Sequence, residues 1–269
     1  RLTGDVFRLI ESYQYGEAGR QIRDFLWDEF CDWYIEASKV ALYGDKEGDG
    51  RRRSVTQSVL AGVLEQAIRL LHPFMPFVTE AIWQALPASV KEGEALIVAQ
   101  WPMSDESGLD DAAESEMGLL MEIVRGIRAV RSEYNVQAGR RISATIAAGT
   151  LTDKLKDNRD VLISLARLDA ETVSIVPSSE PLAQSASIVT GDVVTYLPLA
   201  GMVDLDAERA RLQKELESLR SRIDASEKRL AGPFAEKAPA HIVQRERDNL
   251  ADMRVEAEQV QEQIARLGA

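Results

Sequence analysis

Apolar side chains recur at helical spacing through roughly the first 87 residues. They follow the period of an amphipathic helix in residues 3–43 and again on both sides of the Pro73–Pro76 break. A polar, Gly-rich loop, GDKEGDGRRRS at 44–54, separates the first helical stretch from the next. The pattern predicts an antiparallel helical bundle. The short apolar segment ALIVAQWP that follows it is predicted to pack back in an extended conformation.

A heptad pattern occupies the last quarter of the chain and is interrupted once. Its apolar positions are Leu205, Leu212, Leu216, Leu219, Ile223 and Leu230, then Val243, Leu250, Met253, Ala257, Val260, Ile264 and Leu267. Gly232-Pro233 and Pro239 lie between the two runs, and both residue types end helices. We predict an intramolecular antiparallel coiled-coil hairpin, capped at its start by Asp204, whose partner positions have numbers that sum to about 470.

The middle of the chain alternates between helical and strand-like patterns. ESEMGLLMEIVRGIRAVRSEY at 114–134 predicts a long helix, and TDKLKDNRDVLISLARL predicts an amphipathic one. The strand-like runs are RRISATIAA, TVSIV, SASIV and DVVTYLPL. The fold class is therefore mainly α, with a small α/β module between bundle and hairpin. We expect three parts, at residues 1–110, 111–201 and 202–269.

Composition narrows the class of protein. The 269 residues are 45% hydrophobic, which suits globular packing, and the net charge of −12 argues against a surface that binds nucleic acid everywhere. No run of about 18 apolar residues, no signal-peptide layout and no initiating Met occur, so we expect a soluble, cytoplasmic piece of a longer protein. The single Cys31 excludes an internal disulfide and is expected to be a small buried residue.

The residue pattern indicates no catalytic centre and no metal site. The two histidines, His72 and His241, fall on different predicted parts and have no cysteine partner, so they are interpreted as turn residues. The glycine-rich 44–50 segment lacks the Lys-Ser/Thr of a phosphate-cradling loop. Five aromatic residues follow a helical face and are expected in the bundle core: Phe25, Trp27, Phe30, Trp33 and Tyr34.

Arginine and lysine residues are more informative, because guanidinium groups suit phosphate oxygens. Arginines recur every three residues along the predicted 114–134 helix, and Tyr134 at its end could stack on a base. The alternative is a solvated helix face paired with acidic residues. Short basic clusters also lie at the end of the 44–54 loop and near the hairpin tip. The alternative for both is that a soluble surface needs charged residues there in any case. The candidate RNA contacts are Arg51, Arg52, Arg53, Arg125, Arg128, Arg131, Arg140, Arg141, Lys237, Arg245 and Arg247, with His241 beside the last group.

Four segments, taken in order, resemble the C-terminal part of the valyl-tRNA synthetase family. They are FLWDEFCDWYIEASK, LLHPFMPFVTEAIWQALP, IVRGIRAVRSEYNV and the LAGMVDLDAERARLQKELESL entry to the hairpin with its FAEKAPAHIVQRERDNLADM tip. The first two are shared with the isoleucyl and leucyl enzymes, whereas the hairpin entry and the EKAP tip are specific to the valyl type. The resemblance covers nearly the whole chain.

The resemblance implies a class Ia anticodon-binding bundle, an α/β connector and a coiled-coil arm that lies against the outer corner of tRNA. It also implies a monomeric parent that attaches valine to its tRNA with ATP and Mg, in catalytic and editing domains of the same chain. The family's His-x-Gly-His and Lys-Met-Ser-Lys-Ser motifs do not occur in these residues. We therefore expect no cofactor in this part, and tRNA as its partner. The alternative function is a coiled-coil protein-interaction or scaffolding module.

Overall fold

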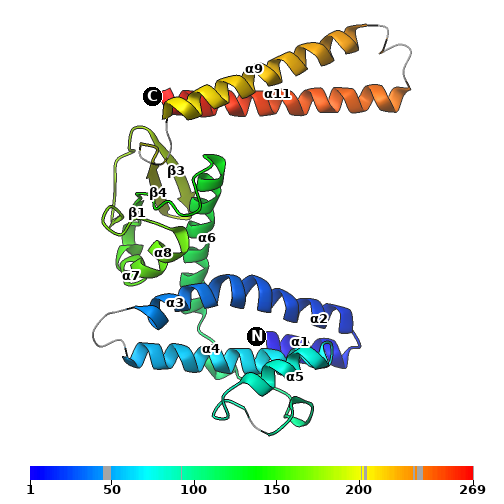
Figure 1. Ribbon diagram of the computed structural model, residues 1–269, viewed down its shortest axis with the longest axis vertical. Coiled ribbons are helices and arrows are strands. Elements are labelled where there is room, and N and C mark those ends of the chain that lie inside the picture. The colour runs from blue at the N-terminus through cyan, green and yellow to red at the C-terminus, as the bar shows by residue number, and fades with distance from the viewer. Residues whose placement is uncertain are drawn as a thin grey trace. The chain divides into compact units, whose positions relative to one another are not determined.

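The computed structural model describes residues 1–44, 50–91, 93–200, 202, 205–232, 234 and 239–268, with backbone only at 205–208, 240 and 266–268 (Figure 1). The chain divides into two compact units, which are described separately. The first holds Arg1–Met121 and Arg159–Leu165, and the second holds Glu122–Asn158 and Ala166–Ala269. The predicted cap Asp204 lies outside the described residues, as do Pro233 and residues 235–238 of the predicted tip.

The first unit is a helical bundle, as predicted. Its main helices are α1 (Leu2–Glu11), α2 (Tyr15–Asp24), the π-helix η1 (Phe25–Ile35), α3 (Glu36–Tyr43), α4 (Gly50–Leu71) and α5 (Pro76–Ala85). α2, η1 and α3 run on without a break, and α4 packs against α2 and α3 (Figure 1). One core cluster joins α1, α2 and α4 through Val6, Ile22 and Leu70, while a second gathers Ile68, Trp83 and Leu96.

The segment after the bundle differs in part from the extended prediction. Leu96–Val98 forms a single 3₁₀ turn, η2, although the flanking Ala95 and Ala99 are extended. The Leu96 amide donates to a Glu80 carboxylate oxygen at 2.8 Å, and the Leu96 side chain is buried beside Trp83. A second short turn, η3, covers Glu106–Gly108. The chain therefore does pack back on α5, but through a turn held by a side-chain acceptor.

The π-helix η1 alters which of the five aromatic residues predicted for the core are buried. Phe30 and Trp33 are buried as predicted, and the Phe25, Phe30 and Tyr34 rings stack at centroid distances of 6.5 and 6.2 Å. Trp27 is 69% exposed and Cys31 is also exposed, so the predictions that placed both in the interior are wrong. A π-helix has more residues per turn than an α-helix, so a face inferred from α-helical spacing shifts along its length.

The second unit contains a four-stranded mixed sheet. The strands are β1 (Thr145–Ala147), β2 (Ser174–Val176), β3 (Ser185–Thr190) and β4 (Val193–Pro198), in the order β2-β1-β4-β3. β1 pairs in parallel with β2 and antiparallel with β4, which forms a hairpin with β3. Ile146 in β1 is fully buried. This confirms the small α/β module expected from the strand-like runs.

Three short helices lie between the first two strands in the sequence. Between β1 and β2 lie η4 (Gly149–Leu151), α7 (Thr152–Asp157) and α8 (Arg159–Ala166). The single helix predicted here is broken at Asn158, whose backbone and side-chain N–H groups both donate to the Lys154 carbonyl and end α7. The long predicted helix is α6 (Asp111–Glu133), which begins in the first unit and ends in the second.

Gly126 lets α6 approach β3 closely. A Cβ atom at Gly126 would lie 2.7 Å from the Cγ2 atom of Ile188, whereas one at Gly118, on the same helix, would meet nothing within 4 Å. Gly118→Ala is expected to stabilise the helix by about 0.5–1 kcal/mol. Gly126→Ala should lower the free energy of unfolding by about 1 kcal/mol, because overpacking outweighs the same helical gain. Urea unfolding of the two variants checks this, and an equal gain at both positions would contradict it.

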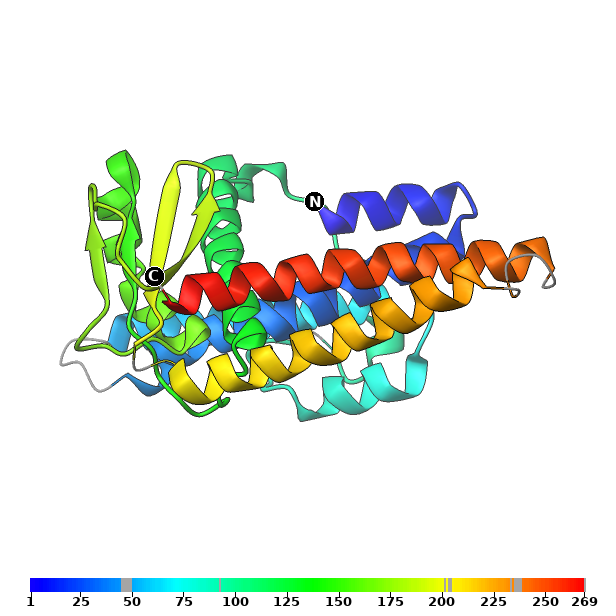
Figure 2. The same cartoon turned by 90° about the horizontal axis from the view of Figure 1, so that it is seen from above.

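Two long helices form the arm. They are α9 (Leu205–Ala231) and α11 (Ala240–Gly268), which lie side by side and antiparallel (Figures 1 and 2). Their buried seam includes Leu212, Leu216, Leu219, Ser226, Val243, Leu250 and Val260. Ser226 donates to a Glu246 carboxylate oxygen at 2.8 Å, and these two numbers sum close to the predicted value. The hairpin and its register are thus confirmed.

Across the described ranges, no helix combines the length and the hydrophobicity needed to cross a membrane.

Candidate nucleic-acid interface

Only two of the three predicted arginines on α6 lie on its exposed side. Arg125 and Arg128 are exposed, but Arg131 is only 8% exposed. A spacing of three residues rotates the side chain by about 60° around an α-helix, so Arg131 lies about 120° from Arg125. This drift turns Arg131 toward the interior. The predicted three-residue stripe is therefore a two-residue surface, which we call the α6 basic face (Arg125 and Arg128).

Arg131 instead holds the loop that follows α6. Its Nη2 atom donates to the carbonyl oxygens of Gln137, at 3.2 Å, and Arg140, at 2.9 Å. Burial, and secondarily the positive charge of Arg167, lower the pKa of the Arg131 guanidinium below its ordinary value. Because both carbonyls would otherwise lack this donor, Arg131 is a structural residue of this turn rather than a surface phosphate contact.

Tyr134 is likewise buried, at 3% exposed, so the prediction that it could stack on a base is wrong. α6 ends just before it. The Val136 amide donates back to the Arg131 carbonyl at 2.8 Å, and Asn135 takes a positive φ of 50°. This helix-ending motif reverses the chain and leaves Tyr134 facing the core. Asn tolerates the left-handed conformation better than most residues, which explains its place here.

The predicted pair Arg140 and Arg141 is exposed. Arg141 donates through Nη1 to the Leu168 carbonyl at 2.9 Å, and the Arg140 carbonyl is the acceptor for Arg131. The Arg140 backbone is thus held by the Arg131 side chain, while the Arg141 guanidinium is itself held by the Leu168 carbonyl.

In the first unit, Arg51, Arg52 and Arg53 are all exposed in the first turn of α4. Arg53 donates to the Gly44 carbonyl at 3.1 Å. Cations at a helix N-terminus oppose the helix dipole, so this run does not stabilise α4. An anionic partner would relieve the unfavourable arrangement.

On the arm, Arg245, Arg247 and His241 are exposed, whereas the predicted Lys237 lies outside the described residues. The pattern analysis missed Arg220. Glu227 pairs with Arg254 at 2.7 Å across one edge of the hairpin. The exposed Arg220 lies one heptad before Glu227 and the exposed Arg247 one heptad before Arg254, so on antiparallel helices they lie on this edge on opposite sides of the pair. A heptad count from the seam to its flanking positions would have found this edge from the sequence.

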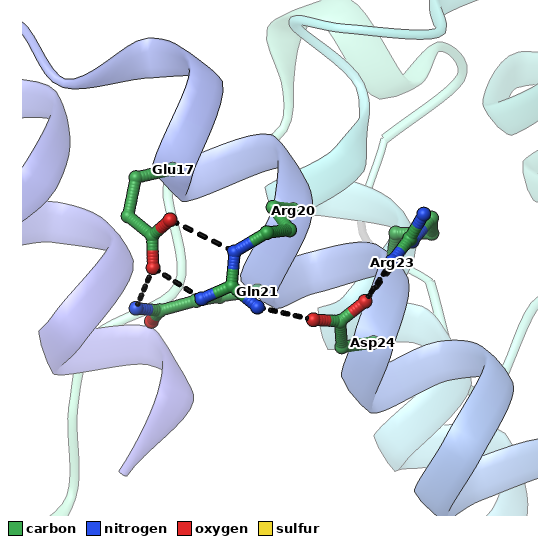
Figure 3. Close-up of polar contacts among 5 residues, drawn as sticks. All are labelled: Glu17, Arg20, Gln21, Arg23 and Asp24. Carbon is green, nitrogen blue, oxygen red and sulfur yellow. Dashed lines mark hydrogen bonds and ion pairs between the residues drawn. The ribbon is translucent and has the colours of Figure 1, made fainter. Parts of the chain in front are cut away.

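On α2, two arginines pair with acidic residues of their own helix. Arg20 on α2 donates to Glu17 at 2.8 Å and to Asp24 at 2.6 Å, and Arg23 also pairs with Asp24 (Figure 3). Hydrogen bonds from Arg20 and then Gln21 lower the pKa of Glu17 to about 2. This network balances two arginines with two carboxylates and stabilises α2 (Figure 3).

The lowered pKa of Glu17 sets the pH range over which the α2 network acts. The network contributes fully above the ordinary glutamate pKa of about 4.5, and it is lost as the pH falls toward 2. Because the group is exposed to solvent, acid is expected to loosen α2 locally rather than unfold the bundle.

The histidines occupy separate structural positions. His72 lies in the turn between α4 and α5, as predicted, and its Nδ1 atom lies 2.8 Å from the hydroxyl of Thr79 on α5. His241 is exposed within α11, so the prediction that it is a turn residue is wrong. Within the residues that the structure covers, no three His, Cys, Asp or Glu side chains gather to hold a metal ion. The described residues include a set of exposed guanidinium groups, on α4, α6 and the arm helices and in the loop after α6. Such a set can bind phosphate oxygens but supplies no general acid or base.

Comparison with known proteins matches both ends of the chain. The model of the "Anticodon-binding domain of tRNA ligase" matches residues 1–146, and that of the "Valyl tRNA synthetase tRNA binding arm" matches residues 204–268. Valine–tRNA ligase of Bacillus subtilis is 37% identical over 265 residues, which are 97% of this chain and 29% of that protein. Its counterparts in Dehalococcoides mccartyi and Bacillus anthracis are each 40% identical, over 93% and 97% of the chain. The chain thus spans under a third of the length of these relatives.

Proposed function

This chain belongs to the family of the anticodon-binding domain of tRNA ligases, and from this premise we propose that it is the tRNA-binding part of a valine–tRNA ligase. The observation that carries the proposal is the order of two recognition elements on one chain. A helical bundle of the anticodon-binding type precedes an arm of the valyl type, and relatives of that name match both together.

We assign the two elements different tasks. The bundle reads unstacked bases of the anticodon loop, whose edges and faces are open to side chains in a way that paired bases are not. The arm adds phosphate contacts along the tRNA backbone, which raise affinity without reading sequence. Residues 1–110, 111–201 and 202–269 are the proposed bundle, connector and arm.

Exposed arginines are the proposed phosphate contacts. They comprise the α6 basic face, the three arginines at the start of α4, the two arginines in the loop after α6 and the exposed arginines of the arm. Compared with the set predicted from the sequence, Arg220 is added and Arg131 is removed. Lys237 stays a prediction. Since the chain carries a net charge of −12, confining these cations to local surfaces lets an acidic protein hold a polyanion. The set is Arg51, Arg52, Arg53, Arg125, Arg128, Arg140, Arg141, Arg220, Arg245 and Arg247.

The reaction itself is proposed for the longer protein. The relatives named valine–tRNA ligase are more than three times as long as this chain, and we propose that attachment of valine to tRNA with ATP and Mg uses residues of that longer protein. We propose that the parent acts as a monomer in the cytoplasm, with its catalytic and editing domains on the same polypeptide. The scaffolding alternative is less well supported, because the arm seam is satisfied within one chain by contacts such as Ser226 to Glu246.

Binding of the 269-residue chain to valine tRNA and to a second tRNA, at two salt concentrations, tests the proposal. We expect tighter binding to valine tRNA, and an affinity that falls as salt rises because bound cations displace counterions from phosphates. Equal or absent binding of both tRNAs would contradict the proposed function. Light scattering of the chain alone, if it showed a stable dimer, would favour the scaffolding alternative.

A further inference from the structure

Two tyrosines project from the turn between α1 and α2. Tyr13 is 80% exposed and Tyr15 is 50% exposed. Their rings meet edge to face, with centroids 6.2 Å apart and planes at 84°. This geometry is the favourable one for an aromatic pair, and it orients each ring with its neighbour while leaving much of both surfaces open.

The backbone under Tyr13 is in a conformation that tyrosine disfavours. α1 ends in a motif in which the Tyr13 amide donates to the Ile10 carbonyl and the Gln14 amide donates to the Leu9 carbonyl, at 3.0 and 2.8 Å. Tyr13 takes a φ of 60°, at the position of this motif where glycine is usual. A bulky side chain is strained there, and an 80% exposed ring recovers little of that cost through burial.

The surface around the pair is polar and open. Glu11, Ser12, Gln14 and Gly16 are all exposed, and a Cβ atom at Gly16 would meet nothing within 4 Å. The Gln14 side chain donates to the Ser12 hydroxyl at 3.0 Å, so an amide and a hydroxyl accompany the rings in this turn. A protein partner bound by apolar contact would need a broader hydrophobic patch than two rings set among polar groups.

We propose that Tyr13 and Tyr15 form a stacking site for one unpaired nucleobase of RNA, an inference that rests on the proposed function. A nucleobase has the required chemistry, because its flat face stacks on an aromatic ring while its edges pair with amide and hydroxyl groups. Stacking on exposed aromatics is the usual way in which proteins hold unpaired bases. The strained tyrosine is then explained by binding, since glycine would serve the fold better.

Tyr13→Gly separates a binding role from a structural one, because the two roles predict opposite signs. Relief of the strain should raise the thermal midpoint by about 2 °C or more, while removal of the ring should weaken valine tRNA binding about five-fold or more. Tyr13→Phe, which keeps the ring, should bind valine tRNA as tightly as the unmodified chain does. Phe77→Ser is the matched control, because Phe77 is a 91% exposed aromatic of the same unit outside the pair, and the affinity of this variant should match that of the unmodified chain.

A fluorescent base locates the contact. Valine tRNA carrying 2-aminopurine at single anticodon-loop positions should show one position that is quenched on binding the unmodified chain and released by Tyr13→Gly. If the unmodified chain binds tRNA and Tyr13→Gly binds equally well, the stacking site is wrong and the proposed function stands. If the unmodified chain binds no tRNA, the proposed function fails and the stacking site fails with it.

Discussion

Replacing Leu219 with aspartate is expected to separate the two helices of the arm. Leu219 is 2% exposed in the seam between the antiparallel helices α9 and α11. A carboxylate held there without a partner costs several kcal/mol, in addition to the apolar packing that the leucine side chain supplies. In the part of the arm that the structure describes, the buried residues lie in this seam, so the arm should fray rather than bury the charge. Amides of both helices should then exchange with solvent much faster.

Ser218→Asp is the control for the Leu219 substitution. Ser218 is the preceding residue on α9, but it is exposed, so the same new charge should change stability by less than about 0.5 kcal/mol. Under the proposed function, Leu219→Asp should also weaken tRNA binding while Ser218→Asp leaves it nearly unchanged. Retained exchange protection along α9 and α11 in Leu219→Asp would mean that the seam does not hold the arm together.

The second large expected effect separates the exposed arginines of α6 from the buried one. Arg125→Gln combined with Arg128→Gln should reduce the slope of log affinity against log salt by about 0.7–0.9 for each phosphate that is no longer neutralised. The folded state should be nearly unaffected, because both side chains are exposed. Tight tRNA binding at low salt should become weaker and less sensitive to salt.

Arg131→Gln should instead lower the stability of the fold and leave the salt dependence of tRNA binding unchanged. It removes hydrogen bonds to the Gln137 and Arg140 carbonyls and is expected to lower the free energy of unfolding by about 2 kcal/mol. The salt dependence of tRNA binding should stay as in the unmodified chain. Urea unfolding and binding at several salt concentrations measure both quantities. A flatter salt slope for Arg131→Gln, with an unchanged slope for the double variant, would reverse our assignment of surface and structural arginines.

Local pattern predicted most of the helices and strands and their order, although it did not predict the π-helix η1, the turn η2 or the break between α7 and α8. The heptad positions and the Gly-Pro break predicted the hairpin because a coiled coil is a one-dimensional repeat, whose partner positions follow from counting. The alternating runs predicted the sheet strands because their side chains alternate between two faces. The positions of the basic clusters were also visible from the sequence, although their exposure was not.

Tertiary structure decided which side chains of these elements are available. The helical period already rotates Arg131 about 120° away from Arg125, but only the packing of α6 decides that this side of the helix is buried. Tyr134 is buried where the end of α6 turns back on the chain that follows it. Trp27 is exposed because the helix widens at η1. The strain at Tyr13 depends on two backbone hydrogen bonds that end α1. Sequence thus determined most of the helices and strands, the hairpin and the resemblance to a tRNA-binding family, since these depend on local periodicity and motif. Exposure and strain depend on contacts between distant residues, so only the folded chain decided them.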